Sequence, residues 1–221
     1  MKKIAIGLGL LIGLLAIAKT MGILVNYKLP TTSNEPTLPL NSHLIATSLV
    51  RSDIGDFATF LPPLLGEVNE VFVKRLCGLE GDEIEMKNGI FYRNGKNFDE
   101  NLVLQHSYVI PDKTFLELNK KQPVIDNQAL LDGTYQVMLS DVRAKEFGIL
   151  DLKVIHHSSD LGPPVLRELN EKGTWTRDNF GPLTIPSDMA FFMGDNRHYS
   201  YDCRFYGFVP IEDITGTVLW K

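Results

Sequence analysis

The sequence has little cysteine, no excess of basic residues, and no repeated or low-complexity segment. Cys77 and Cys203, the two cysteines among 221 residues, are too few for a disulfide framework or a cysteine-based metal cluster, although one bridge between them stays open. A formal net charge of −5 argues against a nucleic-acid partner, because such proteins normally present a basic face. With 44% hydrophobic and 22% charged residues, the composition is ordinary for a folded chain and does not indicate disorder.

Only the N-terminal hydrophobic run is long enough to concern a membrane. The basic tip 1–3 precedes an uncharged run from Ile4 to Ala18. A cleaved secretory signal, a buried core helix and an uncleaved anchor all fit this pattern. We favour an anchor over residues 1–25, because a helix continued through Met21–Val25 would reach the roughly 20 residues that a bilayer core requires. Lys19 would then snorkel to the interface, with the tip in the cytoplasm and the body outside it.

Beyond residue 25 the hydrophobic pattern is mainly that of β-strands. The Asn88-Gly89 pair predicts a two-residue hairpin turn, because both residues tolerate positive φ. Ser140 predicts the N-cap of one short helix, which would end at Phe147 before Gly148. Alternating or β-branched residues predict strands over residues 71–77, 83–87, 90–93, 135–139, 152–155, 189–193 and 215–220.

Two residues could together perform nucleophilic chemistry, Ser33 in a turn-like segment and Lys74 on a predicted strand. Phe72, Lys74 and Leu76 share one face of that strand. A lysine between two apolar neighbours loses hydration, which lowers its pKa toward that of a useful base. The ordinary alternative is an edge lysine with a solvated head, and a serine without a base beside it is inert.

The segment 194–210 is dense in polar groups, yet aromatic and aliphatic residues border it on both sides. Polar side chains in an apolar neighbourhood need partners, so we expect an Asp202–Arg204 ion pair and a turn at Asp195-Asn196. A solvated loop of turn-forming residues is the alternative. The same two interpretations apply to His198, which could be a partnered side chain in an apolar neighbourhood or an exposed residue of a solvated loop.

In order and wording, the three segments resemble the type I signal peptidase family, which uses a serine–lysine dyad. That family carries Ser-Met-x-Pro-Thr-Leu just after its anchor, then Lys-Arg-x-x-Gly-x-x-Gly-Asp, and finally Gly-Asp-Asn-Arg-x-x-Ser-x-Asp-Ser-Arg-x-x-Gly-x-Val-Pro. The matching residues here are Ser33-Asn34-Glu35-Pro36-Thr37-Leu38, Lys74-Arg75-Leu76-Cys77-Gly78-Leu79-Glu80-Gly81-Asp82 and Gly194 to Pro210. The resemblance covers residues 29–82 and 181–210.

The resemblance implies a serine endopeptidase that needs no metal or cofactor. Ser33 would attack the peptide carbonyl, and a neutral Lys74 would take its proton. The Ser33 backbone N–H and the Thr31 hydroxyl would form the oxyanion hole. Three residues of the last segment would support the site, the first by orienting the lysine: Ser200, Asp202 and Arg204.

Some positions depart from the family pattern. Asn34 replaces the common methionine after the nucleophile, and Cys203 replaces a serine. In Arg51 to Phe57, Gly55-Asp56 stands where the family has two valines, which weakens a strand expected to line the substrate groove. These changes concern the groove and leave the dyad in place.

The expected fold is mainly β: a signal-peptidase-like β-sheet body behind one N-terminal transmembrane helix, with a variable, β-rich insertion. We expect an anchor over 1–25, a catalytic β domain from 26–96 and 181–221, and an inserted region over 97–180. His156-His157 predicts no metal site, because adjacent side chains on a strand point to opposite faces and no partner lies at ligand spacing.

The resemblance implies an enzyme that removes signal peptides from exported preproteins, cutting after small residues. It would cross the bacterial inner membrane once, with the catalytic domain on the periplasmic side and the lipid bilayer and preproteins as partners. Two alternatives stay open: a specialised peptidase for pilin-like or conjugation proteins, and a catalytically silent, membrane-tethered binding domain. Soluble self-cleaving repressors share the serine–lysine pair but lack an N-terminal membrane segment.

Overall fold

The computed structural model describes residues 21–63, 70–157, 163–170 and 173–220, together with Gly7 and Gly13. In this part of the chain, none of the helices has the length and apolar character needed to cross a membrane. Most of the predicted anchor over 1–25 lies outside the described residues. Its predicted continuation through Met21–Val25 is wrong: Gly22 takes a φ of +70°, and a strand, β1 (Leu24–Lys28), follows. Positive φ ends a right-handed helix, and pairing with β2 (His43–Thr47) then stabilises the extended chain.

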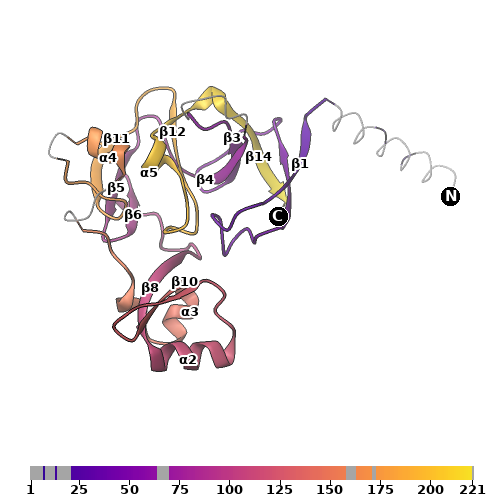
Figure 1. The fold of residues 1–221 in the computed structure, drawn as a ribbon. Helices are drawn as coiled ribbons and strands as arrows, with labels where there is room; N and C mark the ends of the chain where they lie inside the picture. The colour runs from indigo at the N-terminus through magenta and orange to yellow at the C-terminus, as the bar shows by residue number, and fades with distance from the viewer. Residues whose placement is uncertain are drawn as a thin grey trace.

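The largest sheet is antiparallel and has seven strands in the order β1-β2-β14-β3-β4-β12-β13. Strands from the two ends of the sequence therefore lie side by side, as the indigo and yellow arrows show (Figure 1). Its further strands are β3 (Phe57–Phe60), β4 (Phe72–Leu79), β12 (Met189–Met193), β13 (Val209–Pro210) and β14 (Ile214–Trp220). Because β4 and β12 are neighbours, the lysine segment lies beside the chain that enters residue 194.

A second antiparallel sheet has the order β11-β5-β6-β7. The predicted hairpin is confirmed, since Asn88 and Gly89 take φ of 48° and 74° between β5 and β6. Buried side chains of both sheets share one core, in which the rings of Phe91 and Phe191 stack 5.8 Å apart. The strands are β5 (Glu83–Lys87), β6 (Ile90–Arg93), β7 (Lys96–Asn97) and β11 (Phe180–Thr184).

A third sheet, in the order β8-β10-β9, packs with two helices around a core of its own. Figure 1 shows this group below the other two sheets. Its members are β8 (Gln105–Pro111), α2 (Asp112–Lys121), β9 (Asn127–Ala129), β10 (Thr134–Ser140) and α3 (Asp141–Glu146). The predicted N-cap is confirmed: Ser140 Oγ accepts a hydrogen bond from the Arg143 N–H at 3.3 Å.

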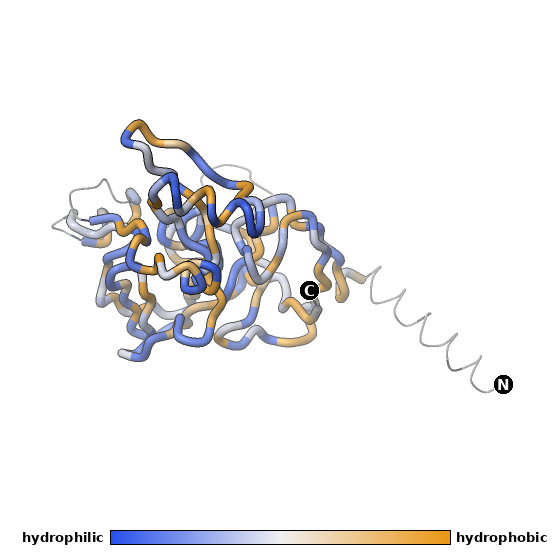
Figure 2. Tube along the Cα trace, turned by 90° about the horizontal axis from the view of Figure 1, so that it is seen from below, coloured by the Kyte–Doolittle hydropathy of each residue, from blue (hydrophilic) through white to orange (hydrophobic). Residues whose placement is uncertain are grey.

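The prediction of a mainly β chain is confirmed, and two local predictions are corrected. No helix was expected at α2, and the strand expected over 152–155 is wrong, because η1 (Leu150–Leu152) leads into a single bridge between Lys153 and Tyr108. The remaining short elements are α4 (Pro164–Glu168), α5 (Cys203–Tyr206) and η2 (Ile211–Asp213). Along the body of the tube in Figure 2, hydrophobic and hydrophilic residues alternate over short distances, as half-buried strands require.

Candidate active site

Ser33 and Lys74, predicted from separate segments, are brought into direct contact. Ser33 lies in a turn closed by a hydrogen bond from the Glu35 N–H to the Thr32 carbonyl at 3.0 Å. Lys74 extends from β4, where it pairs with Ala58 of β3. Lys74 Nζ is hydrogen-bonded to Ser33 Oγ, and both residues are about 5% exposed. The nucleophile and base proposed from the sequence thus meet in a buried position.

The surroundings of Lys74 favour its neutral form. Burial is the largest cause, and it lowers the pKa of this lysine from 10.5 to about 8. The Asp202 carboxylate opposes the shift, while the Arg204 guanidinium adds to it. The Phe72 ring lies 6.0 Å from Nζ, as expected for residues on one face of a strand. A lysine in this setting can take a proton near neutral pH.

Two hydrogen-bond donors lie at the predicted nucleophile. Thr31 Oγ1 is 3.1 Å from Ser33 Oγ. Among the described residues, nothing accepts a hydrogen bond from the Ser33 backbone N–H. Both groups are therefore placed where an oxyanion could form beside the hydroxyl.

Asp202 and Arg204 form the expected ion pair, and it is fully buried. Arg204 donates from Nε and Nη2 to the two carboxylate oxygens at 2.8 Å each. Burial alone would raise the pKa of Asp202, but the adjacent guanidinium holds this pKa below its usual value. The same carboxylate accepts the Gly194 N–H at 3.2 Å. The pair therefore fixes the end of β12, next to the dyad.

Ser200 is buried beside the dyad, but its hydroxyl is not hydrogen-bonded to Lys74. Within the described residues its Oγ has no hydrogen bond of ordinary geometry, although it contributes to the low pKa of Asp202. Ser200 instead packs directly over Gly194. The predicted orienting hydrogen bond to Lys74 is therefore not present among these residues.

A hollow of about 250 Å³ opens beside the dyad. Its walls are mainly aromatic and aliphatic, and they come from β1, β4, the segment that contains Ser33 and the segment 199–201. Tyr199 and Tyr201, which are about half exposed, also line it. The residues that line it are Tyr27, Lys28, Leu29, Pro30, Thr31, Ser33, Asn34, Glu70, Val71, Phe72, Val73, Lys74, Tyr199 and Tyr201. Such a space accommodates small side chains of a peptide.

Two asparagines position the nucleophile, and sequence reasoning did not assign them this role. Asn34 Nδ2 donates to the Val73 carbonyl at 2.8 Å, which ties the residue after Ser33 to the residue before the lysine. Asn196 donates its backbone N–H to the Ser33 carbonyl at 3.1 Å, and its Nδ2 to the Thr32 carbonyl at 3.1 Å. Asn34 and Asn196 each lie within a segment that resembles the family. That location was the only indication in the sequence that they could act at the site.

Arg75 and Asp195 form a second buried ion pair behind the dyad. The Arg75 guanidinium donates from Nε at 2.7 Å and from Nη2 at 2.5 Å to the two carboxylate oxygens. The Thr37 hydroxyl donates to the same carboxylate. All three family strings therefore meet at one carboxylate. Thr37 comes from the string that contains the serine, Arg75 from the string that contains the lysine, and Asp195 from the third string.

The positions that depart from the family pattern lie close to the site. Cys77 and Cys203 are both free and buried, which answers the disulfide question left open by the sequence. The Phe192 N–H donates to Cys203 Sγ at 3.0 Å. Gly55 takes a φ of +98°, and β3 begins only at Phe57, so the groove strand is shortened there.

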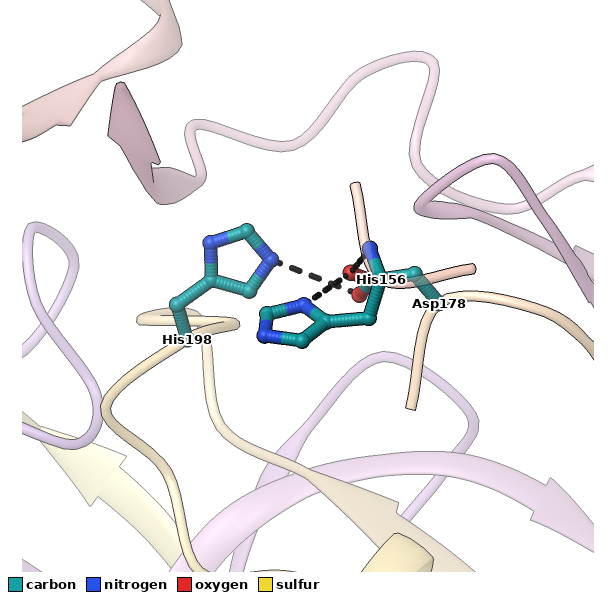
Figure 3. Close-up of side chains that lie close together, drawn as sticks. All are labelled: His156, Asp178 and His198. Atoms are coloured by element: carbon teal, nitrogen blue, oxygen red, sulfur yellow. Dashed lines mark hydrogen bonds and ion pairs between the residues drawn. The ribbon is translucent and has the colours of Figure 1, made fainter. Parts of the chain in front are cut away.

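One cluster of possible metal ligands was not expected from the sequence. His156 was predicted to lack a partner, but Asp178 and His198 converge on it (Figure 3). His156 Nδ1 lies 2.8 Å from Asp178 Oδ2, and His198 Nε2 lies 3.3 Å from Asp178 Oδ1. These partners are distant in sequence, so no local spacing could have indicated them.

Comparisons with known proteins point to one family. The sequence model of a family described as signal peptidase, peptidase S26, matches residues 2–221. A probable signal peptidase I-2 of Synechocystis is 25% identical over 195 residues, which are 85% of this chain and 58% of that protein. Signal peptidase I of Bacillus caldolyticus is 30% identical over 194 residues, 87% of this chain and 76% of that protein.

Further similarities are found in a third relative and a solved structure. Signal peptidase I P of Bacillus subtilis subsp. natto is 31% identical over 187 residues, covering 83% of this chain and 69% of that protein. A crystal structure of a signal peptidase I from Enterococcus faecalis V583 matches with a TM-score of 0.38 and 21% identity, over 77% of this chain and 98% of that one. The chain thus spans 58% of the Synechocystis relative and more of the others.

Proposed function

The chain belongs to the signal peptidase family, peptidase S26, a family of serine endopeptidases, and from this premise we propose that it removes N-terminal signal peptides by serine–lysine catalysis. One observation carries the proposal: Lys74 Nζ and Ser33 Oγ are hydrogen-bonded to each other in a buried position beside a hollow. A nucleophile with a base in direct contact is what acyl transfer requires.

In the first step, Ser33 Oγ attacks the carbonyl carbon of the scissile bond. Its proton passes to the neutral Lys74 Nζ, whose pKa of about 8 allows this near neutral pH. The negative oxygen that forms would be bound by the Ser33 N–H and by the Thr31 hydroxyl. These donors cost little to reorganise, because the turn already holds them in place.

In the second step, the Lys74 ammonium returns the proton to the leaving amine as the C–N bond breaks. An ester on Ser33 remains. A water molecule then gives its proton to Lys74 Nζ and attacks the ester carbonyl, which releases the signal peptide and restores the serine. The buried Asp202–Arg204 pair stays ionised and holds the wall of the site throughout.

The substrate class follows from the family, since the similar relatives are signal peptidases. The hollow of about 250 Å³ beside the dyad gives substrate side chains a place to bind, and cleavage after small residues is what the resemblance to the family implies. Exported preproteins would be the substrates. We place the enzyme in a bacterial inner membrane, with a single anchor in the N-terminal residues that precede β1 and the dyad on the periplasmic side.

The proposed division of the chain has a catalytic β domain from 26–96 and 181–221 and an insertion over 97–180. The separate core formed by β8, β10, α2 and α3 supports this division. Leu166 and Phe180, near the end of the insertion, pack into the core of the other two sheets instead. The last part of the insertion therefore already packs against the catalytic body before β11 begins.

The test compares purified full-length variants on a preprotein substrate. Ser33→Ala and Lys74→Ala should each lower kcat/KM by several orders of magnitude, because each removes a reacting group. Lys96→Met, which changes an exposed lysine on β7, is the matched control and should cleave like the parent. Retained cleavage in either dyad variant would contradict the mechanism, and failure of the parent to cleave any peptide would support a silent binding domain.

A specialised processing peptidase is the second candidate, and the shortened β3 with Asn34 in the hollow favours it. Its chemistry would be the same. The parent enzyme would then leave an ordinary secretory preprotein uncut and cleave a pilin-like or conjugation-type precursor. Measuring both substrates side by side with one enzyme preparation separates the two candidates.

A further inference from the structure

The chain that follows β12 pairs with the edge of β8 in the insertion. The Gln105 N–H donates to the Asp195 carbonyl at 3.0 Å, and the Arg197 N–H donates to the Gln105 carbonyl at 2.9 Å. These bonds form a parallel bridge between Gln105 and Asn196. Through these two hydrogen bonds, residues 195–197 of the active-site segment extend the edge of the third sheet.

A histidine side chain replaces the next backbone acceptor. In a parallel ladder, the Ser107 N–H would donate to the Arg197 carbonyl. That carbonyl instead accepts from Arg204 Nη2 at 2.7 Å. The Ser107 N–H donates to His198 Nδ1 at 3.0 Å. The imidazole therefore ends the pairing without leaving a buried N–H of β8 unsatisfied.

This geometry determines the protonation of His198. A ring nitrogen that accepts from an N–H has no hydrogen of its own, so in the neutral ring the hydrogen is on Nε2. His198 Nε2 faces Asp178 Oδ1 at 3.3 Å, and can donate to it. Asp178 Oδ2 accepts from the backbone N–H and Nδ1 of His156, both at 2.8 Å. Figure 3 shows both rings directed at this carboxylate.

The same hydrogen bond argues against a metal ion. Two imidazoles and a carboxylate are a common ligand set, and these three lie within 4.8 Å of one another. A neutral His198 bound to metal through Nε2 would carry its hydrogen on Nδ1. That hydrogen would face the Ser107 N–H, donor against donor. Metal-binding histidines normally donate from the second nitrogen, which this ring cannot do.

The turn that contains His198 is attached directly to the nucleophile. The Tyr199 N–H donates to the Asn196 carbonyl at 3.1 Å, which closes the turn around His198. Asn196 in turn donates its N–H to the Ser33 carbonyl. Tyr199 lines the hollow, and Ser200 packs over Gly194. A shift of the imidazole would therefore move groups on two sides of the dyad.

We propose that His198 is a positioning residue of the active site: its neutral imidazole accepts the Ser107 N–H and donates to Asp178, and so fixes the turn 196–199 that holds Ser33 and presents Tyr199 and Ser200. This inference rests on the proposed peptidase function. It assigns a role to the insertion, whose strand β8 supplies the N–H and whose residue Asp178 supplies the carboxylate.

Protonation of His198 would break the arrangement, because a hydrogen on Nδ1 repels the Ser107 N–H. Burial is the largest cause that lowers the pKa of His198 and so supports the neutral form; Asp178 opposes this shift, while Arg204 and His156 add to it. The groups that face this residue are His106 on β8 at 5.4 Å between ring centres, His156 at 5.5 Å, Asp178, Arg177, whose Nη1 reaches the His198 carbonyl at 3.4 Å, and Arg204. Burial and the Arg204 guanidinium together outweigh the Asp178 carboxylate, so the cationic ring is disfavoured.

The experiment compares three replacements of His198 in the full chain. His198→Asn keeps an acceptor at the Nδ1 position for Ser107, His198→Gln keeps only a donor near Asp178, and His198→Phe keeps neither. We expect His198→Phe to lower kcat/KM about tenfold, mainly because the Ser107 N–H loses its buried acceptor. His198→Asn should recover most of this loss. The acid limb of the pH profile should move to higher pH in His198→Phe, because a looser turn lets water reach Lys74.

A matched control and a spectroscopic measurement make the result decisive. Leu118→Ala destabilises the core of the insertion without touching the turn, and should leave the acid limb unmoved. Selective ¹⁵N-histidine labelling of the Ser33→Ala chain should show a ring protonated on Nε2 at pH 7 whose signal is absent from the His198→Asn spectrum and unchanged by added Zn²⁺. Because this spectrum needs no activity, it separates failure of the inference from failure of the proposed function.

Two outcomes would overturn the inference. One is a His198→Phe variant whose acid limb matches that of Leu118→Ala, which would reduce the residue to a structural role. The other is stoichiometric Zn²⁺ binding that shifts the His198 resonance and disappears in His156→Asn, which would make the cluster a metal site.

Discussion

Gly194 lies so close to Ser33 that no side chain fits between them. A Cβ on Gly194 would be 2.7 Å from Ser200 Cβ and closer still to the Ser33 carbonyl oxygen. The second contact is with backbone, which cannot rotate away. Gly194, at the end of β12, is therefore in close contact with both the turn that contains Ser33 and the buried Ser200.

Gly194→Ala should accordingly separate Ser33 from Lys74. A displacement of the serine by about 1 Å lowers the rate by about 100-fold, so we expect at least that loss in kcat/KM. Gly133→Ala is the matched control, because a Cβ there meets nothing within 4 Å. It should lose some stability from its positive φ and keep full activity. A Gly194→Ala enzyme as active as this control would show that the contact relaxes freely.

The pH dependence of cleavage should follow the lysine. Only neutral Lys74 accepts a proton, and burial lowers its pKa to about 8. In the free enzyme kcat/KM should therefore rise about tenfold per pH unit up to about pH 8, and then level off. The measurement is initial rates on a peptide substrate between pH 6 and 10 at constant ionic strength. A profile that is flat from pH 6 upward would assign the base to another group.

Asn34 should matter for geometry more than for the chemistry of the hollow. Its Nδ2 bond to the Val73 carbonyl joins the nucleophile turn to β4 at 2.8 Å. Asn34→Met restores the common family residue but removes this bond. We expect about 1 kcal/mol less stability and about tenfold lower kcat/KM.

The matched control for this variant is Asn119→Met. Asn119 Oδ1 accepts the Val124 N–H at 2.9 Å, far from the dyad, so its loss should lower Tm by a similar amount without changing activity. If Asn34→Met instead raised kcat/KM on an ordinary preprotein, Asn34 would be a specificity residue, and the specialised peptidase would gain support.

Both cysteines should be inert toward alkylating reagents in the folded protein. Burial raises the pKa of Cys77 to about 12 and also raises the pKa of Cys203. Nucleophilic attack requires the thiolate, which is scarce at pH 8 for such thiols. Mass spectrometry after iodoacetamide treatment should detect no adduct on the native chain and two on the unfolded chain, without prior reduction. One adduct or none after unfolding would indicate a disulfide.

Local patterns in the sequence were sufficient to predict those structural features that depend only on neighbouring residues. The Asn88-Gly89 turn and the Ser140 cap are such cases, because turn and cap chemistry act over a few residues. Helix α2 was missed since Phe115 and Leu118 are its only fully buried residues, which leaves little periodicity to detect. Strand β1 was missed because an apolar run does not reveal that β2 will pair with it.

The candidate site divides in the same way. Resemblance to family strings placed Ser33 and Lys74, and the structure brings them together. The resemblance did not indicate that Ser200 packs on Gly194 and makes no hydrogen bond to Lys74. The partners of His198 lie 91 and 20 residues away, at Ser107 and Asp178. Long-range pairings of this kind depend on the whole fold, and no spacing rule contains them.

The parallel bridge between Gln105 and Asn196 limits how this protein can change in evolution. An insertion that shares a ladder with the loop beside the nucleophile cannot be deleted as a unit, although its outer helices can vary. Relatives that shorten or exchange the region must supply another strand edge or rebuild that loop. Diversity in this part of the chain should therefore concentrate at α2 and β9, while β8 keeps its length and register.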